Sequence, residues 1–160
     1  MIRLAMLVLL VTPAAAEVAD PALVRACHEG AAAWDAGPAC IGAAAEACQA
    51  GAGGGSTPGI VGCLSSEADA WDALLNEEYG LLRDALRADD AAAGGESRAD
   101  ALRDAQRAWI AFRDADCALA WSIWQDGTIR GPVAARCRLD HTARRALELR
   151  HLRRDGEGNL

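Results

Sequence analysis

Apolar residues recur at steps of three and four along two stretches of the chain, which is the spacing of one face of an α-helix. The first stretch has them at Leu64, Ala68, Trp71, Leu75, Tyr79, Leu82 and Leu86. The second has them at Leu102, Ala105, Trp109, Phe112, Ala120 and Trp124. A break at residues 89–95 separates the two, and Ser97 with Asp100 forms a capping arrangement for the second. We predict two long helices that form an antiparallel hairpin and pack along both stripes.

Shorter helical patterns flank this hairpin. Asp20 followed by Pro21 opens a predicted helix to about Trp34, and a second helix covers residues 37–49. The glycine-rich stretch 51–59 predicts no regular structure. A final helix opens at Gly131–Pro132, with a less regular stripe at Val133, Cys137, Leu139, Ala143, Ala146 and Leu149. The tail, residues 155–160, is expected to fray. The composition, rich in alanine, leucine and arginine, predicts an all-α fold without strands.

Six cysteines are spread through the chain, and none forms a Cys-x-x-Cys pair: Cys27, Cys40, Cys48, Cys63, Cys117 and Cys137. An even set of this kind indicates a disulfide framework. Six cysteines allow 15 pairings, of which sequence proximity and helix geometry favour Cys27–Cys40, Cys48–Cys63 and Cys117–Cys137. Because alanine buries little surface, three disulfides at roughly 2–4 kcal/mol each are predicted to supply much of the net stability.

The N-terminus has the organisation of a signal peptide over residues 1–16. Arg3 precedes an apolar run, and Pro13 is followed by three alanines that form a small-residue cleavage site. The run is too short to span a bilayer, and no cysteine follows the cleavage site to carry a lipid anchor. We therefore expect an exported protein, periplasmic or secreted, with residues 17–160 forming a single helical domain. Its net charge of −7 argues against nucleic acid and suits a basic protein partner.

Polar residues follow the predicted hairpin at helical spacing. Buried polar groups need hydrogen bonds, so Asn76, Gln106 and Arg113 are expected to form a network. Asp72 or Glu67 is expected to pair with an arginine. Such a network either fixes the register of the helices or forms a carboxylate–arginine binding site. The residues of this polar seam are Glu67, Trp71, Asp72, Asn76, Tyr79, Gln106, Trp109, Arg113 and Asp114.

The sequence predicts no catalytic, cofactor or metal site. Acidic residues are numerous, but a thin hairpin offers no cleft for general acid–base chemistry. The histidines are scattered, and His141, four residues after Cys137, would matter only beside a free cysteine. Trp121 and Trp124 lie near a turn; core packing is predicted for each of them, although exposed tryptophans are typical of binding surfaces.

The motifs of the hairpin resemble the LprI-type lysozyme-inhibitor domain over about residues 48–150. The most specific piece is AQRAWIAFRDADC, which ends at Cys117, and the first half is similar at Cys63–Leu64, Glu67, Trp71–Asp72, Leu75–Asn76 and Tyr79. The resemblance implies a secreted, helical, disulfide-linked domain, some of whose relatives inhibit lysozyme. It also implies a Cys48–Cys63 pair. The segment with Cys27 and Cys40 lies outside the motif, and the lipoprotein anchor of some relatives is missing.

The sequence therefore predicts a periplasmic protein-binding module that blocks a c-type lysozyme, steered to a basic enzyme by its acidic surface. The candidate inhibitory loop is the glycine-rich stretch, centred on Gly54, Gly55, Ser56 and Thr57, and residues 126–131 form a second candidate. The alternatives are an envelope scaffold or interaction protein and, third, a peptidoglycan-acting enzyme.

Overall fold

The computed structural model describes residues 18–35 and 37–158, and within these ranges the chain folds into five α-helices and no strand. The helices are α1 (Pro21–Gly30), α2 (Ala43–Gln49), α3 (Thr57–Ala93), α4 (Arg98–Ile123) and α5 (Arg130–Gly158). The all-α prediction is confirmed. The predicted signal peptide, residues 1–16, lies outside the described residues. None of the described helices combines the length and the apolar character needed to cross a membrane.

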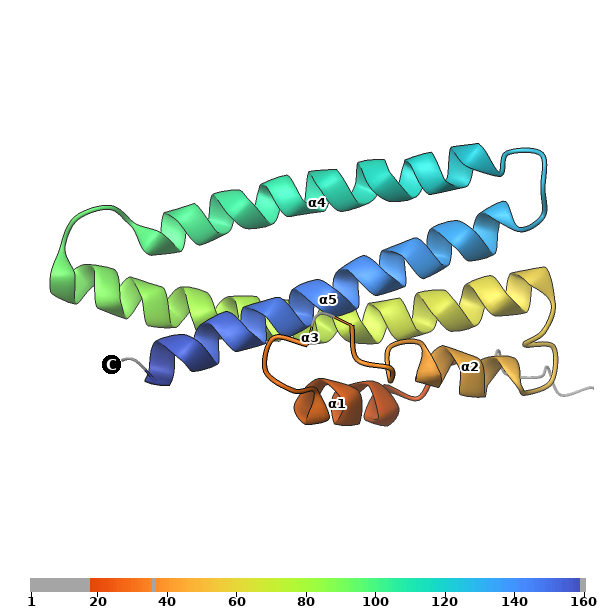
Figure 1. Ribbon diagram of the computed structural model, residues 1–160, viewed down its shortest axis with the longest axis horizontal. Helices are drawn as coiled ribbons and strands as arrows, with labels where there is room; N and C mark the ends of the chain where they lie inside the picture. Colours follow the sequence, from red (N-terminus) through yellow and green to blue (C-terminus); the bar gives the residue numbers. More distant parts are fainter. Residues whose placement is uncertain (1–17, 36, 159–160) are drawn as a thin grey trace, which may run out of the picture.

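The three long helices lie beside one another, and the short helices α1 and α2 cover one side of α3 (Figure 1). α4 runs antiparallel to α3, as predicted, and α5 runs parallel to α3 (Figure 1). However, α3 packs most extensively against α5 and much less against α4. Phe112 and Trp124 of the predicted α4 stripe are 58% and 48% exposed. The prediction that α3 and α4 pack along both stripes is therefore wrong.

The core lies where α5 crosses α3 and where α1 and α2 cover the same region. On α5 the buried face combines leucines with small residues: Leu139, Ala143, Ala146, Leu147 and Leu149. On α3 it is formed by Leu64, Ala68, Trp71, Leu74, Leu75 and Leu82. Trp71 is fully buried, and its ring meets the ring of His28 of α1 with 6.1 Å between centres.

Several helix boundaries differ from the predicted ones. α1 ends at Gly30, before Trp34, and α2 begins only at Ala43. α3 begins at Thr57, because the hydroxyl of Ser56 accepts a hydrogen bond from the Gly59 amide at 3.1 Å and so caps its N-terminus. At the other end of the chain, residues 155–158 are helical rather than frayed.

The three disulfides join the pairs that were predicted. Cys27–Cys40 ties α1 to the segment before α2, Cys48–Cys63 ties α2 to α3, and Cys117–Cys137 ties α4 to α5. Each short or weakly packed helix is thus linked covalently to a neighbour.

Candidate functional site

Glu67 of the polar seam has a structural role at the start of α2. The N-cap of α2 is Gly42, at φ 97°, a left-handed conformation that favours glycine and leaves no side chain to cap the helix. The Glu67 carboxylate takes that place, accepting hydrogen bonds from the amides of Gly42 and Ala45, both at 2.7 Å. The indole N–H of Trp71 donates to the same carboxylate at 3.2 Å. Glu67 therefore binds backbone amides rather than an arginine, and joins α3 to α2.

A groove of about 450 Å³ lies between α3 and α4. Six residues of the polar seam line it: Asp72, Asn76, Tyr79, Gln106, Trp109 and Arg113. Arg103 and Arg107 line it as well, so that the groove is rich in guanidinium groups and aromatic rings. Of the other seam residues, Glu67 and Trp71 lie in the core and Asp114 is exposed.

Arg113 is the buried centre of this groove. Its Nε donates to Asp114 Oδ1 at 3.0 Å, and its Nη1 lies 4.0 Å from Asp72 Oδ1. Asn76 donates to the other oxygen of Asp72 at 2.9 Å. The guanidinium also lies 5.0 Å from the centre of the Trp109 ring. The structure thus brings two of the three carboxylates of the seam, Asp72 and Asp114, to one arginine.

The third helix completes the network. Arg145 of α5 donates to the side-chain oxygen of Gln106 at 2.9 Å, and its guanidinium lies 6.0 Å from the Trp109 ring centre. Arg145 was not predicted, because the seam was assigned to two helices only and Arg145 lies on a third. Arg103 and Arg113 are paired with carboxylates, and the groove presents charged, amide and aromatic groups that suit polar recognition.

The glycine-rich candidate loop is compact. A Cβ on Gly54 would lie 2.6 Å from the carbonyl oxygen of Cys48, so this position packs tightly against the end of α2. The Ser56 hydroxyl donates to the Gly53 carbonyl at 2.7 Å. Gly54 is buried, whereas Gly55 and Ser56 are exposed, and Thr57 is the exposed first residue of α3. The loop is therefore packed against the end of α2 and the start of α3.

The second candidate loop lies at the same end of the molecule as the first (Figure 1). Around it, four large apolar side chains are exposed: Trp121, Ile123, Trp124 and Ile129. The prediction that Trp121 and Trp124 pack in the core is wrong, because they are 43% and 48% exposed at the end of α4. We call residues 51–57 and 121–131 together the loop end.

A buried ionic network links α3 to α1 and α5, away from the α3–α4 groove, and it was not predicted. Glu78 accepts two hydrogen bonds from Arg153 of α5, at 2.7 and 3.2 Å, and its carboxylate lies 3.5 Å from the ring of His28. Burial lowers the pKa of His28 below its ordinary value of 6.5, although Glu78 partly opposes this. A signal was present, because Glu78 lies eleven residues after Glu67, on the apolar stripe itself.

The fold and this arrangement define a helical, disulfide-linked protein in which polar side chains join the helices. The LprI lysozyme-inhibitor family matches residues 48–149, so the chain belongs to this family. An uncharacterized protein of Rhizobium meliloti (strain 1021) is 34% identical over 100 residues, which cover 59% of this chain and 72% of the relative. No solved structure matches the chain.

Proposed function

We propose that the protein is exported by the signal peptide at residues 1–16 and inhibits a c-type lysozyme in the periplasm or outside the cell. Membership of the LprI family supports the inhibitory function. The loop end supports a location for the contact, because two loops and four exposed apolar side chains meet there. Tryptophan is enriched among the residues that carry binding energy.

The proposed mechanism has two steps. The acidic surface, with a net charge of −7, attracts a basic enzyme and raises the rate of encounter. The loop end then covers the substrate cleft. Lysozyme cleaves with a pair of carboxylates in that cleft, and Arg130 offers an exposed guanidinium beside Trp121, whose ring centre is 4.7 Å away. The protein acts by obstruction, without chemistry of its own.

The test is a turbidity assay in which lysozyme clears a bacterial cell suspension at low salt. The native chain is expected to slow clearing at micromolar concentrations. The absence of any inhibition removes this proposal.

A matched pair of variants tests the location of the contact. Ile129 at the loop end and Leu81 near the far end of α3 are both aliphatic and both 49% exposed. Ile129→Ser is expected to weaken inhibition about tenfold, the loss of one good contact, whereas Leu81→Ser leaves it unchanged. Equal effects of the two substitutions contradict the proposed location.

The exposed tryptophans also favour a second candidate function, an envelope scaffold that binds another periplasmic protein through the same surface. The test is capture of envelope proteins on the immobilised native chain. The scaffold function is favoured if one envelope protein is captured, if Ile129→Ser abolishes this capture, and if lysozyme does not bind. Catalysis on peptidoglycan gains no support, because Glu67 is bonded to backbone amides in the core.

A further inference from the structure

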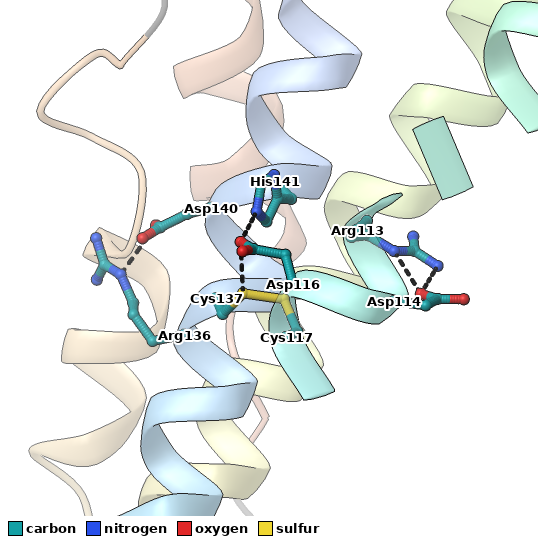
Figure 2. The surroundings of a disulfide bond; sticks show 8 residues. All are labelled: Arg113, Asp114, Asp116, Cys117, Arg136, Cys137, Asp140 and His141. Carbon is teal, nitrogen blue, oxygen red and sulfur yellow. Dashed lines mark hydrogen bonds and ion pairs between the residues drawn. A yellow bond between two sulfur atoms is a disulfide. The ribbon is translucent and has the colours of Figure 1, made fainter. Parts of the chain in front are cut away.

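Two metal-ligating side chains lie beside the Cys117–Cys137 disulfide (Figure 2). His141 Nε2 is 2.8 Å from Asp116 Oδ2, and the same oxygen is 3.9 Å from the sulfur of Cys137. The two sulfurs and the imidazole nitrogen all lie within 4.8 Å of one another. Asp116 and Cys117 are neighbours on α4, while Cys137 and His141 are one helical turn apart on α5. Each helix thus contributes two donors.

This donor set has the size and chemistry of a zinc site. Zinc binds cysteine, histidine and carboxylate ligands tetrahedrally at about 2.0–2.3 Å, which places neighbouring ligand atoms about 3.3–3.8 Å apart. The distance of 3.9 Å between Asp116 Oδ2 and the Cys137 sulfur is close to this spacing, whereas His141 Nε2 and Asp116 Oδ2 are closer, at 2.8 Å. Once the sulfur–sulfur bond is broken, rotation of the two cysteine side chains can separate the sulfurs without moving the helices.

Charged groups surround the site, and Arg138, the residue after Cys137, lines the cavity beside Cys117. The two arginines drawn beside the disulfide are each paired with their own carboxylate, Arg113 with Asp114 and Arg136 with Asp140, both at 2.9 Å (Figure 2). Their charges are therefore neutralised locally, while two thiolates and Asp116 bring three negative charges to the site. The rings of Phe112 and His141 pack nearly perpendicular to each other, with 5.5 Å between their centres.

This disulfide is also open to a reductant. Both of its sulfur-bearing residues are partly exposed, and a cavity of about 350 Å³ is lined by Cys117. By contrast, Cys48 and Cys63 are both buried. A dithiol therefore reaches the α4–α5 disulfide more readily than the α2–α3 disulfide.

We propose that the Cys117–Cys137 disulfide is a redox-gated zinc site, in which reduction frees two sulfurs to bind Zn²⁺ together with His141 and Asp116. A dithiol supplies two electrons and two protons: its own sulfurs join in a disulfide, the Cys117–Cys137 bond breaks, and two thiols form. Zn²⁺ then displaces both thiol protons. The metal replaces the covalent link between α4 and α5, so α4 stays attached to α5 under reducing conditions.

The test is a Co²⁺ titration of the full chain, reduced without air by an immobilised dithiol that is removed beforehand. Co²⁺ held by thiolates in a tetrahedral site gives intense visible bands and a sulfur-to-metal band in the near ultraviolet. We expect one Co²⁺ per chain, displaced by Zn²⁺, and no bands before reduction. His141→Ala and Asp116→Asn are expected to weaken binding by about tenfold or more. Asp84→Asn, which changes an exposed carboxylate on α3 outside the donor set, is expected to leave binding unchanged.

Three results overturn the proposal: no bands after reduction, bands that persist in Cys117→Ser/Cys137→Ser, or an affinity that His141→Ala leaves unchanged. Circular dichroism checks the fold of each variant. If the double serine variant loses helix, the test rests on the affinity of His141→Ala for Co²⁺, because this variant keeps all three disulfides during folding. The titration needs no lysozyme, so its outcome is separate from that of the inhibition assay.

Discussion

α4 and α5 are consecutive helices of 26 and 29 residues, yet they are held in different ways. α5 packs against α3 mainly through buried leucines and alanines, with Thr142, Arg145, Arg150 and His151 buried among them. α4 turns several of its largest apolar side chains outward, and two of its four buried residues, Gln106 and Arg113, are polar. A helix with larger apolar side chains is thus less buried than one with alanines, because small residues allow the close approach that excludes water from a shared face.

This contrast separates an inner unit, α3 with α5 and the short helices, from an outer helix. In the inner unit, burial of apolar surface is the main source of stability. In the outer helix, hydrogen bonds, ion pairs and one disulfide have a larger share, and partly exposed interactions of that kind contribute less each.

The largest expected effect is in the inner unit. Trp71→Ala is expected to lower the free energy of unfolding by about 3–5 kcal/mol, because it leaves a cavity at a fully buried position. Urea denaturation followed by circular dichroism measures it. Phe112→Ala on α4, with its ring more than half exposed, is the control and is expected to cost below about 1 kcal/mol. Similar losses in the free energy of unfolding for the two variants would contradict the proposed difference between the inner unit and α4.

Opening the disulfide of the outer helix should be the next largest effect. Cys117→Ser/Cys137→Ser is expected to cost about 3 kcal/mol, since it releases a closed loop with a sequence separation of 20 residues. Native-state hydrogen exchange should then speed up along α4 while α3 keeps its protection. Uniform acceleration in both helices would show that α4 is not separately held.

Removal of the Glu67 carboxylate tests the inner unit through its polar contacts. Glu67→Ala leaves the buried amides of Gly42 and Ala45 without an acceptor, with an expected cost of about 2–3 kcal/mol. Asp72→Ala in the α3–α4 groove is the matched carboxylate, and being half-exposed it should cost less than about 1 kcal/mol. Chemical denaturation measures the free energy of unfolding of both variants. A larger loss of stability for Asp72→Ala than for Glu67→Ala would contradict the structural role of Glu67.

The smallest effect is a pH dependence that arises in the inner unit. Burial lowers the pKa of His28 in the folded state, so below the ordinary value of 6.5 the unfolded chain binds a proton that the folded chain does not. Stability should therefore be complete above pH 6.5 and fall as the pH drops, by no more than about 1.4 kcal/mol per pH unit for this group.

His28→Asn tests this pH dependence. The buried His151 has its pKa shifted in the same direction and keeps its own contribution in this variant. The slope of stability between pH 6.5 and 5 should therefore become shallower without vanishing. An unchanged slope would mean that His28 has no part in it.

The sequence allowed the helices and the disulfides to be predicted because both depend on local spacing. Periodicity identifies which face of a helix is apolar, but it does not say which other helix covers that face. The leucines of α5 were noted, yet Arg145 and the buried His151 interrupt its stripe, so its role as the main partner of α3 was missed. The long-range capping of α2 by Glu67 and the meeting of Asp116 with His141 likewise depend on how the helices pack.

The central functional claim is that the loop end contacts lysozyme, and hydrogen–deuterium exchange of the native chain with and without a c-type lysozyme tests it most directly. When lysozyme is bound, we predict slower exchange in residues 51–57 and 121–131 and unchanged exchange in the α3–α4 connection at residues 94–97. Protection confined to that far connection, or to the groove between α3 and α4, would contradict it.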